Sequence, residues 1–175
     1  MNRAGEPEHY NQGMLALRYA ALLALTVWVG GLVALGAVAA PSMFDVLAAR
    51  QVADARALAG AIFGETLRRF HLISYVCGAV IVCSLAARAI LGPRPRRFAV
   101  RMAITVVILT ASLYSGLAIT PRIDRLRRDI GVSPSSLPAG DARRAEFARL
   151  HGQSTTLELI PVLGGLLLLV WELRD

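Results

Sequence analysis

The stretch MLALRYAALLALTVWVGGLVALGAVAA, residues 14–40, is apolar throughout except for Arg18 near its start. A helix needs about 20 mainly apolar residues to cross a hydrocarbon core of about 30 Å, so this stretch is long enough to do so. Three more stretches meet the same criterion: 71–91, 98–120 and 153–171. Backbone amides in lipid must be satisfied within the chain, and nothing here alternates as barrel strands do. We therefore predict an all-α fold, an integral membrane four-helix bundle.

The composition favours a lipid environment over nucleic acid as the partner of this chain. It has 175 residues, of which 55% are hydrophobic, and a formal charge of +7 in which every basic residue is arginine. Such an excess suits either nucleic acid or an anionic membrane surface. Because the arginines lie between charge-poor apolar runs, we expect the lipid bilayer as the partner and no nucleic acid. A homo-oligomer or a membrane protein partner is compatible with this composition.

The connections between the apolar stretches differ in kind. Residues 1–13 form a polar tail, and residues 92–97 form a short, proline-broken, basic loop. The two longer connections carry helical patterns next to the second and fourth spans, which we therefore expect to extend beyond the bilayer. Short basic loops follow the positive-inside rule. This predicts that the short loop and both termini are cytoplasmic, in a bacterial inner membrane.

An offset of eighty residues aligns rare residue types along the chain. The aligned pairs are Gly36 with Gly116, Pro41 with Pro121, His71 with His151 and Ser74 with Ser154. We interpret the offset as a duplication that makes residues 14–91 and 98–175 two tandem helical-hairpin repeats. The repeats would then be related by an axis along the membrane normal, with both histidines at one depth. We expect the glycines and prolines to be structural, and each proline to close a span.

Several short segments, taken in order, resemble a known family. They are WVGGLV, AAPSMF, LRRFH, LYSGLAITPRID and EFARLHGQS. They are similar to the bacterial members of the transmembrane-protein-205-like group, a domain of unknown function, over nearly the whole chain from about Leu15 to Val170. The resemblance implies a four-span membrane protein with no established activity. The family pattern has an amide residue seven positions after the second histidine, where this chain has Glu158.

Polar side chains inside the apolar stretches mark the candidate site. Glu158 is the one acidic residue well inside a span, where a carboxylate is costly unless it is paired, protonated or wet. Helical spacing puts it on one face with three other polar residues, and the second span offers a similar face. We predict a polar pocket between the repeats, with His71, His151 and Glu158 as ligand or metal candidates. The supporting polar residues are Ser74, Tyr75, Ser154, Thr155, Arg69 and Arg149.

The two histidines have three readings. Beside Arg69 and Arg149 at the bilayer edge, they would satisfy helix-terminal carbonyls or lipid headgroups. As ligands from two related helices they would hold haem or copper, which imidazole suits. In a transport path they would contact protons or anions. We expect both rings to face the interior of the bundle and to share a ligand.

No catalytic motif is present in the sequence. It holds no HExxH segment, no phosphate-binding glycine loop, no CxxC pair and no Ser-His-Asp set. We therefore predict no enzyme and name no catalytic residue. The first functional hypothesis is a membrane protein that handles a small solute, ion or metal at the polar site. The alternatives are a haem-binding or redox membrane protein and a structural or partner-binding subunit.

Overall fold

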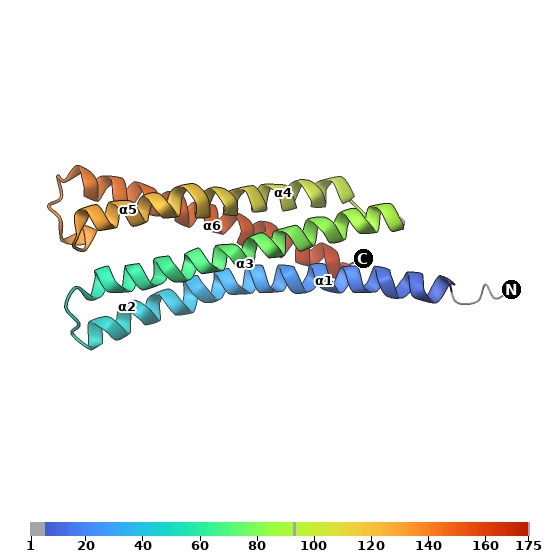
Figure 1. The fold of residues 1–175 in the computed structure, drawn as a ribbon, viewed down its shortest axis with the longest axis horizontal. Helices are drawn as coiled ribbons and strands as arrows, with labels where there is room; N and C mark the ends of the chain where they lie inside the picture. The colour runs from blue at the N-terminus through green and yellow to red at the C-terminus, as the bar shows by residue number, and fades with distance from the viewer. Residues whose placement is uncertain (1–5, 93, 175) are drawn as a thin grey trace.

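The computed structural model describes residues 6–92 and 94–174 (Figure 1). Within these ranges the regular secondary structure is helical and no strand occurs. The elements in chain order are α1 (Glu6–Ala34), η1 (Leu35–Ala39), α2 (Ala40–Ala49), α3 (Ala55–Leu91), α4 (Phe98–Tyr114), η2 (Ser115–Ile119), α5 (Thr120–Ile130), η3 (Pro134–Ser136) and α6 (Ala142–Arg174). The segments η1 and η2 are π-helical and join their neighbours into continuous helices.

The described chain forms the predicted membrane bundle. Four helices, over residues 12–49, 55–91, 98–130 and 142–174, are long and apolar enough to cross a membrane. In the bundle, α1 packs against α3 and α6, and α4 packs against the same two helices. At 1.5 Å per residue the 33 residues of α6 reach about 50 Å, well beyond a hydrocarbon core of about 30 Å. The bundle therefore extends past the bilayer.

Two apolar cores lie along the bundle axis. The larger one is built around buried Trp28, Leu25, Ile81, Leu85 and Ile108. The smaller one is formed by Ile119, Ile123 and Leu150, toward the two long connections. The candidate polar residues lie between these cores, so apolar packing on both sides fixes their depth.

The prediction that Pro41 and Pro121 end their spans is wrong. Each proline lies at the start of an α-helix that directly follows a π-helical segment, and the helix continues through it. Proline lacks an amide hydrogen and its ring clashes with a carbonyl one turn earlier. The wider π turn, in which the Ala40 amide bonds to the Leu35 carbonyl, accommodates that clash without breaking the helix.

The ends of the helices differ from the sequence expectation at the amino terminus. α1 begins at Glu6, so the predicted polar tail is helical from residue 6 to residue 13, while residues 1–5 lie outside the described chain. α5 ends at Ile130 and is capped by Gly131, whose φ of 71° suits glycine. The Asp141 carboxylate accepts a 2.8 Å hydrogen bond from the Arg143 amide at the start of α6. Hydrogen bonds from Arg143 lower the pKa of Asp141.

The two ends of the bundle are not alike. At the end with the long connections, the tips of α2 and α3 diverge from the tips of α5 and α6 (Figure 1). The opposite end carries the short connection between α3 and α4 and the carboxy-terminal end of α6. The divergence begins near η1 and η2, which places the candidate site where the bundle starts to open.

Candidate functional site

A carboxylate, an imidazole and a hydroxyl meet where the divergence begins. The Oε1 atom of Glu158 on α6 lies 2.8 Å from Nε2 of His71 on α3. The same oxygen accepts a 2.7 Å hydrogen bond from Ser115, the first residue of η2. His71 is 2% exposed and the Glu158 side chain 17% exposed. Because α3 belongs to the first half of the chain and α6 to the second, this contact joins the two halves across the bundle.

Tyr75 and Gly116 complete the surroundings of His71. The Tyr75 ring stacks on the His71 ring, with centroids 6.1 Å apart and planes at 16°. A Cβ atom on Gly116 would lie 2.9 Å from Cγ of His71 and would collide with the Tyr75 hydroxyl. Only glycine therefore lets η2 approach both rings.

Several polar atoms of the site have no hydrogen-bond partner among the described side chains. Two of its atoms are buried with no hydrogen-bond partner in the described chain, namely Nδ1 of His71 and Oε2 of Glu158. The same is true of the hydroxyls of Ser74, Ser112 and Thr120. Buried polar groups are nearly always hydrogen-bonded to protein or water. These atoms could form hydrogen bonds to water or to a polar molecule.

A groove of about 510 Å³ runs beside Glu158. One wall of the groove is formed by η1 at Leu35, Gly36 and Ala37, and the opposite wall by α6. A Cβ atom on Gly36 would meet nothing within 4 Å. The groove is mixed in character, with apolar side chains on most of its wall and the polar residues Thr120, Asp124, Arg127, His151, Ser154, Thr155 and Glu158.

His151 is not where the sequence analysis expected it. Its side chain is exposed, stacks on Phe147 with centroids 6.0 Å apart, and lines the groove. It also lines a second cavity of about 450 Å³ between the helix tips, and Arg127 borders both spaces. The prediction that both histidine rings face the interior is therefore wrong for His151, and the shared ligand stays a prediction. The repeat aligns His151 with His71 in the sequence, yet the two side chains differ in exposure.

The arrangement does not fit haem or copper held between the two histidines. Nε2 of His71 is engaged by Glu158, and His151 stacks on Phe147 outside the bundle interior. Across residues 6–92 and 94–174, no three His, Cys, Asp or Glu side chains gather as a metal site would need. The chemistry of this site is therefore that of a carboxylate held by two hydrogen bonds.

The remaining predicted site residues lie at several places. Ser74 is 1% exposed and Ser154 is 7% exposed. Thr155 lines the groove and donates to the His151 carbonyl at 3.0 Å. Arg69 pairs with Glu65 at 2.7 Å on the outer surface, and Arg149 is exposed. The two arginines therefore belong to the surface and not to the polar site.

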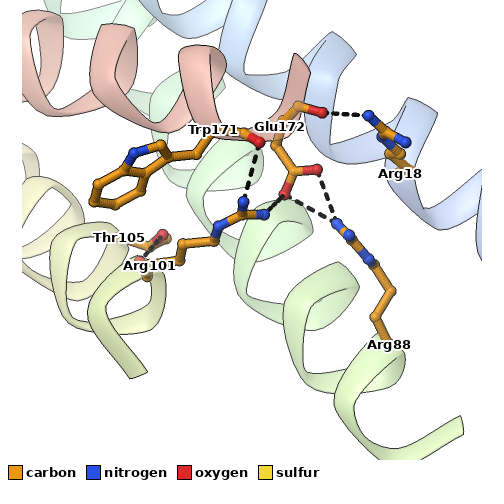
Figure 2. A network of polar contacts seen from close by, with 6 residues as sticks. All are labelled: Arg18, Arg88, Arg101, Thr105, Trp171 and Glu172. Atoms are coloured by element: carbon orange, nitrogen blue, oxygen red, sulfur yellow. Dashed lines mark hydrogen bonds and ion pairs between the residues drawn. The ribbon is translucent and has the colours of Figure 1, made fainter. Parts of the chain in front are cut away.

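A second polar cluster lies at the opposite end of the bundle (Figure 2). Both Arg88 on α3 and Arg101 on α4 pair with Glu172 on α6, at 2.9 Å and 3.1 Å. All three residues are buried. Arg101 also donates to the Trp171 carbonyl at 3.0 Å, and Arg18 on α1 donates to the Glu172 carbonyl. The cluster ties all four long helices together.

The second cluster was not predicted from the sequence. Arg88, Arg101 and Glu172 each lie at the edge of an apolar stretch, where a charge ordinarily reaches the headgroups. The available signal was that two basic residues and one acidic residue end neighbouring spans at the same side of the membrane. The long hydrogen-bonded side chains point across the bundle end and make a structural clamp.

Comparison with known proteins identifies a family. The chain matches the sequence profile of DUF4149, a domain of unknown function, over residues 23–131. The protein belongs to the DUF4149 family. The DUF4149 match includes η1, η2, His71 and Ser115, and it ends before α6, which carries Glu158. No curated protein and no solved structure matches the chain.

Proposed function

We propose that this protein binds a small polar or amphiphilic solute at Glu158 and handles it within the membrane. One observation carries the proposal. Oε1 of Glu158 is held by His71 and Ser115, while Oε2 has no partner among the described residues and the side chain lines a groove of about 510 Å³. A hydroxyl or ammonium group of a solute would satisfy that oxygen.

His71 and Ser115 act as positioning residues in this proposal. Two hydrogen bonds fix the carboxylate, so its orientation is set before a solute arrives and less ordering entropy is lost on binding. Gly116 supports this geometry because it lets His71 lie directly against η2. The site is thus preorganised by packing from both halves of the bundle.

The cavity between the helix tips supplies an access route from water. Arg127 and His151 line this cavity and also the groove beside Glu158. Arg127 is oriented by its contact with the Gly60 carbonyl and lies 5.3 Å above the Phe147 ring. A solute entering between the tips would meet Arg127 and His151 first and Glu158 last.

We also propose a duplication and a more specific relationship for the chain. The two π-helical segments lie eighty residues apart and each precedes an aligned proline, which supports a tandem repeat of 14–91 and 98–175. The ordered segments of the sequence support membership of the transmembrane-protein-205-like group. The basic loop at 92–97 supports cytoplasmic termini in a bacterial inner membrane.

The test compares two Glu→Gln variants on one helix. Wild-type protein, Glu158→Gln and Glu146→Gln are purified from their own membranes, and the retained small molecules are identified by native mass spectrometry. Glu146 is an exposed residue of α6 and provides the matched control. We expect the wild type and the control to retain a molecule that Glu158→Gln loses.

The opposite result favours a structural subunit. If all three proteins carry the same molecules, or the wild type carries none, the proposed solute site is wrong. Glu158 would then serve to hold the halves together. In that case Glu158→Gln should still lower the unfolding midpoint relative to Glu146→Gln.

A further inference from the structure

The two halves of the bundle surround their π-helical segments differently. In the second half, the glycine of η2, Gly116, is covered by the rings of His71 and Tyr75. In the first half, the glycine of η1, Gly36, is exposed and a Cβ there would meet nothing within 4 Å. The space beside the glycine is thus filled by side chains in the second half and open in the first half.

One position of the eighty-residue register accounts for part of this difference. Tyr75 corresponds to Thr155, and both lie on the helix that carries the aligned histidine. Tyr75 places its ring and hydroxyl over η2, whereas Thr155 is small and lines the groove that contains Gly36. The groove therefore includes the space that a tyrosine side chain occupies in the other half.

We infer that the groove at Gly36 binds an amphiphile whose head is a hydroxylated aromatic ring. This inference rests on the proposed function and gives the chemical class of its solute. The ring takes the place that Tyr75 takes over Gly116. The volume of about 510 Å³ holds such a ring together with part of an apolar tail.

The groove offers partners for both parts of this molecule. Pro41 has no amide hydrogen to donate to the preceding turn, and the Glu158 carboxylate lines the same groove, so a ligand hydroxyl has candidate acceptors there. Leu32, Val33, Leu159 and Val162 line the groove with apolar surface for the tail. Because Val33 and Leu159 are also exposed on the outside of the bundle, the tail has a path into the lipid.

The test uses three octyl compounds that differ only in the head. Full-length protein in lipid nanodiscs is titrated with para-octylphenol, octylbenzene or octanol by calorimetry, and empty nanodiscs are subtracted. The variants are Thr155→Tyr, which supplies the missing ring, and Thr156→Tyr, which makes the same change on an exposed position outside the groove.

The expected pattern depends on both the ring and the hydroxyl. Wild-type protein should bind para-octylphenol at least about tenfold more tightly than either other compound, as its ring fills the space beside Gly36 and its hydroxyl donates to an acceptor of the groove. Thr155→Tyr should weaken para-octylphenol binding at least about tenfold, while Thr156→Tyr should stay within about twofold of wild type. Equal binding of octylbenzene, or an unaffected Thr155→Tyr, would overturn the inference.

Two further variants separate the possible failures. Gly36→Leu fills the groove from its opposite wall and should also abolish binding of para-octylphenol. It replaces Thr155→Tyr as the test if that variant folds poorly. Glu158→Gln leaves the ring position open. Loss of the native molecule from Glu158→Gln with no effect of Thr155→Tyr or Gly36→Leu would keep the proposed function and reject the aromatic ligand. If the groove-filling variants lose para-octylphenol binding while Glu158→Gln keeps the native molecule, the aromatic ligand is kept and the proposed function is rejected.

Discussion

Tyr75 lies against Gly116 so closely that a methyl group cannot be added to the glycine without moving the tyrosine hydroxyl. The tyrosine belongs to α3 and the glycine to η2, so this contact joins the two hairpins. It lies next to the hydrogen bond between His71 and Glu158. A change at Gly116 therefore reaches the carboxylate through the rings.

Adding a methyl group at Gly116 and at Gly36 should have opposite effects on stability. Gly116→Ala should lower the free energy of unfolding by about 1–3 kcal/mol, because it overpacks a filled site. Gly36→Ala should be neutral or raise it by up to about 1 kcal/mol, because the space is open and alanine favours helix. Thermal unfolding in detergent measures both. Equal losses in the two variants would show that the halves are packed alike.

The two substitutions of Glu158 should differ sharply in folding. Glu158→Gln keeps an oxygen that accepts from Ser115 and should give nearly the wild-type yield of folded protein. Glu158→Lys replaces the acceptor of both hydrogen bonds with a cation beside His71 and should cost at least about 3 kcal/mol. The monodisperse fraction on size-exclusion chromatography reports the difference. Similar yields of the glutamine and lysine variants would contradict a defined hydrogen-bonded centre.

Removing the charge of Glu172 should destabilise the bundle strongly. Glu172→Gln takes the carboxylate from two buried guanidinium groups, Arg88 and Arg101, and breaking a buried pair costs about 3–5 kcal/mol. Glu65→Gln is the matched control, since Glu65 also pairs with two arginines but on the exposed surface. Its loss should be much smaller. Unfolding midpoints that fall equally would show that the burial of the cluster contributes nothing.

The two ends of the bundle should label from opposite sides of the membrane. In a variant with Cys77 and Cys83 replaced by alanine, Arg94→Cys should react with an impermeant thiol reagent only from the cytoplasmic side. Ser135→Cys should react only from the outside, because its loop lies at the other end of the helices. Reaction of Arg94→Cys in intact cells would invert the proposed topology.

The membrane fold could be predicted from the sequence because the bilayer imposes a length on every apolar stretch. The inward position of Glu158 could be inferred for a related reason, since a carboxylate inside a span needs a partner. The hydrogen-bond partner of Glu158 could be narrowed from the sequence only to a set of polar residues. Helical spacing placed His71 and His151 on polar faces, but it does not determine how each helix is rotated against its neighbours.

Other features depend on contacts that no local pattern encodes. The π-helical turns directly precede Pro41 and Pro121, and each helix continues through its proline. A proline in an apolar stretch is equally typical of a helix end. Glu172 lies at the edge of an apolar stretch, a position typical of side chains that reach the headgroups. Only the packing of α3 and α4 beside α6 turns it inward.

The clamp at Glu172 also has a consequence for the order of biosynthesis. Glu172 follows Arg101 by 71 residues and Arg88 by 84 residues. The chain is made from its amino end at about 5–20 residues per second, so both arginines reach the membrane before the carboxylate that pairs with them has been synthesised. Until α6 inserts, Arg88 on α3 and Arg101 on α4 cannot pair with Glu172. Insertion of the last helix is therefore the step that brings the carboxylate to the two arginines and joins the four helices at this end of the bundle.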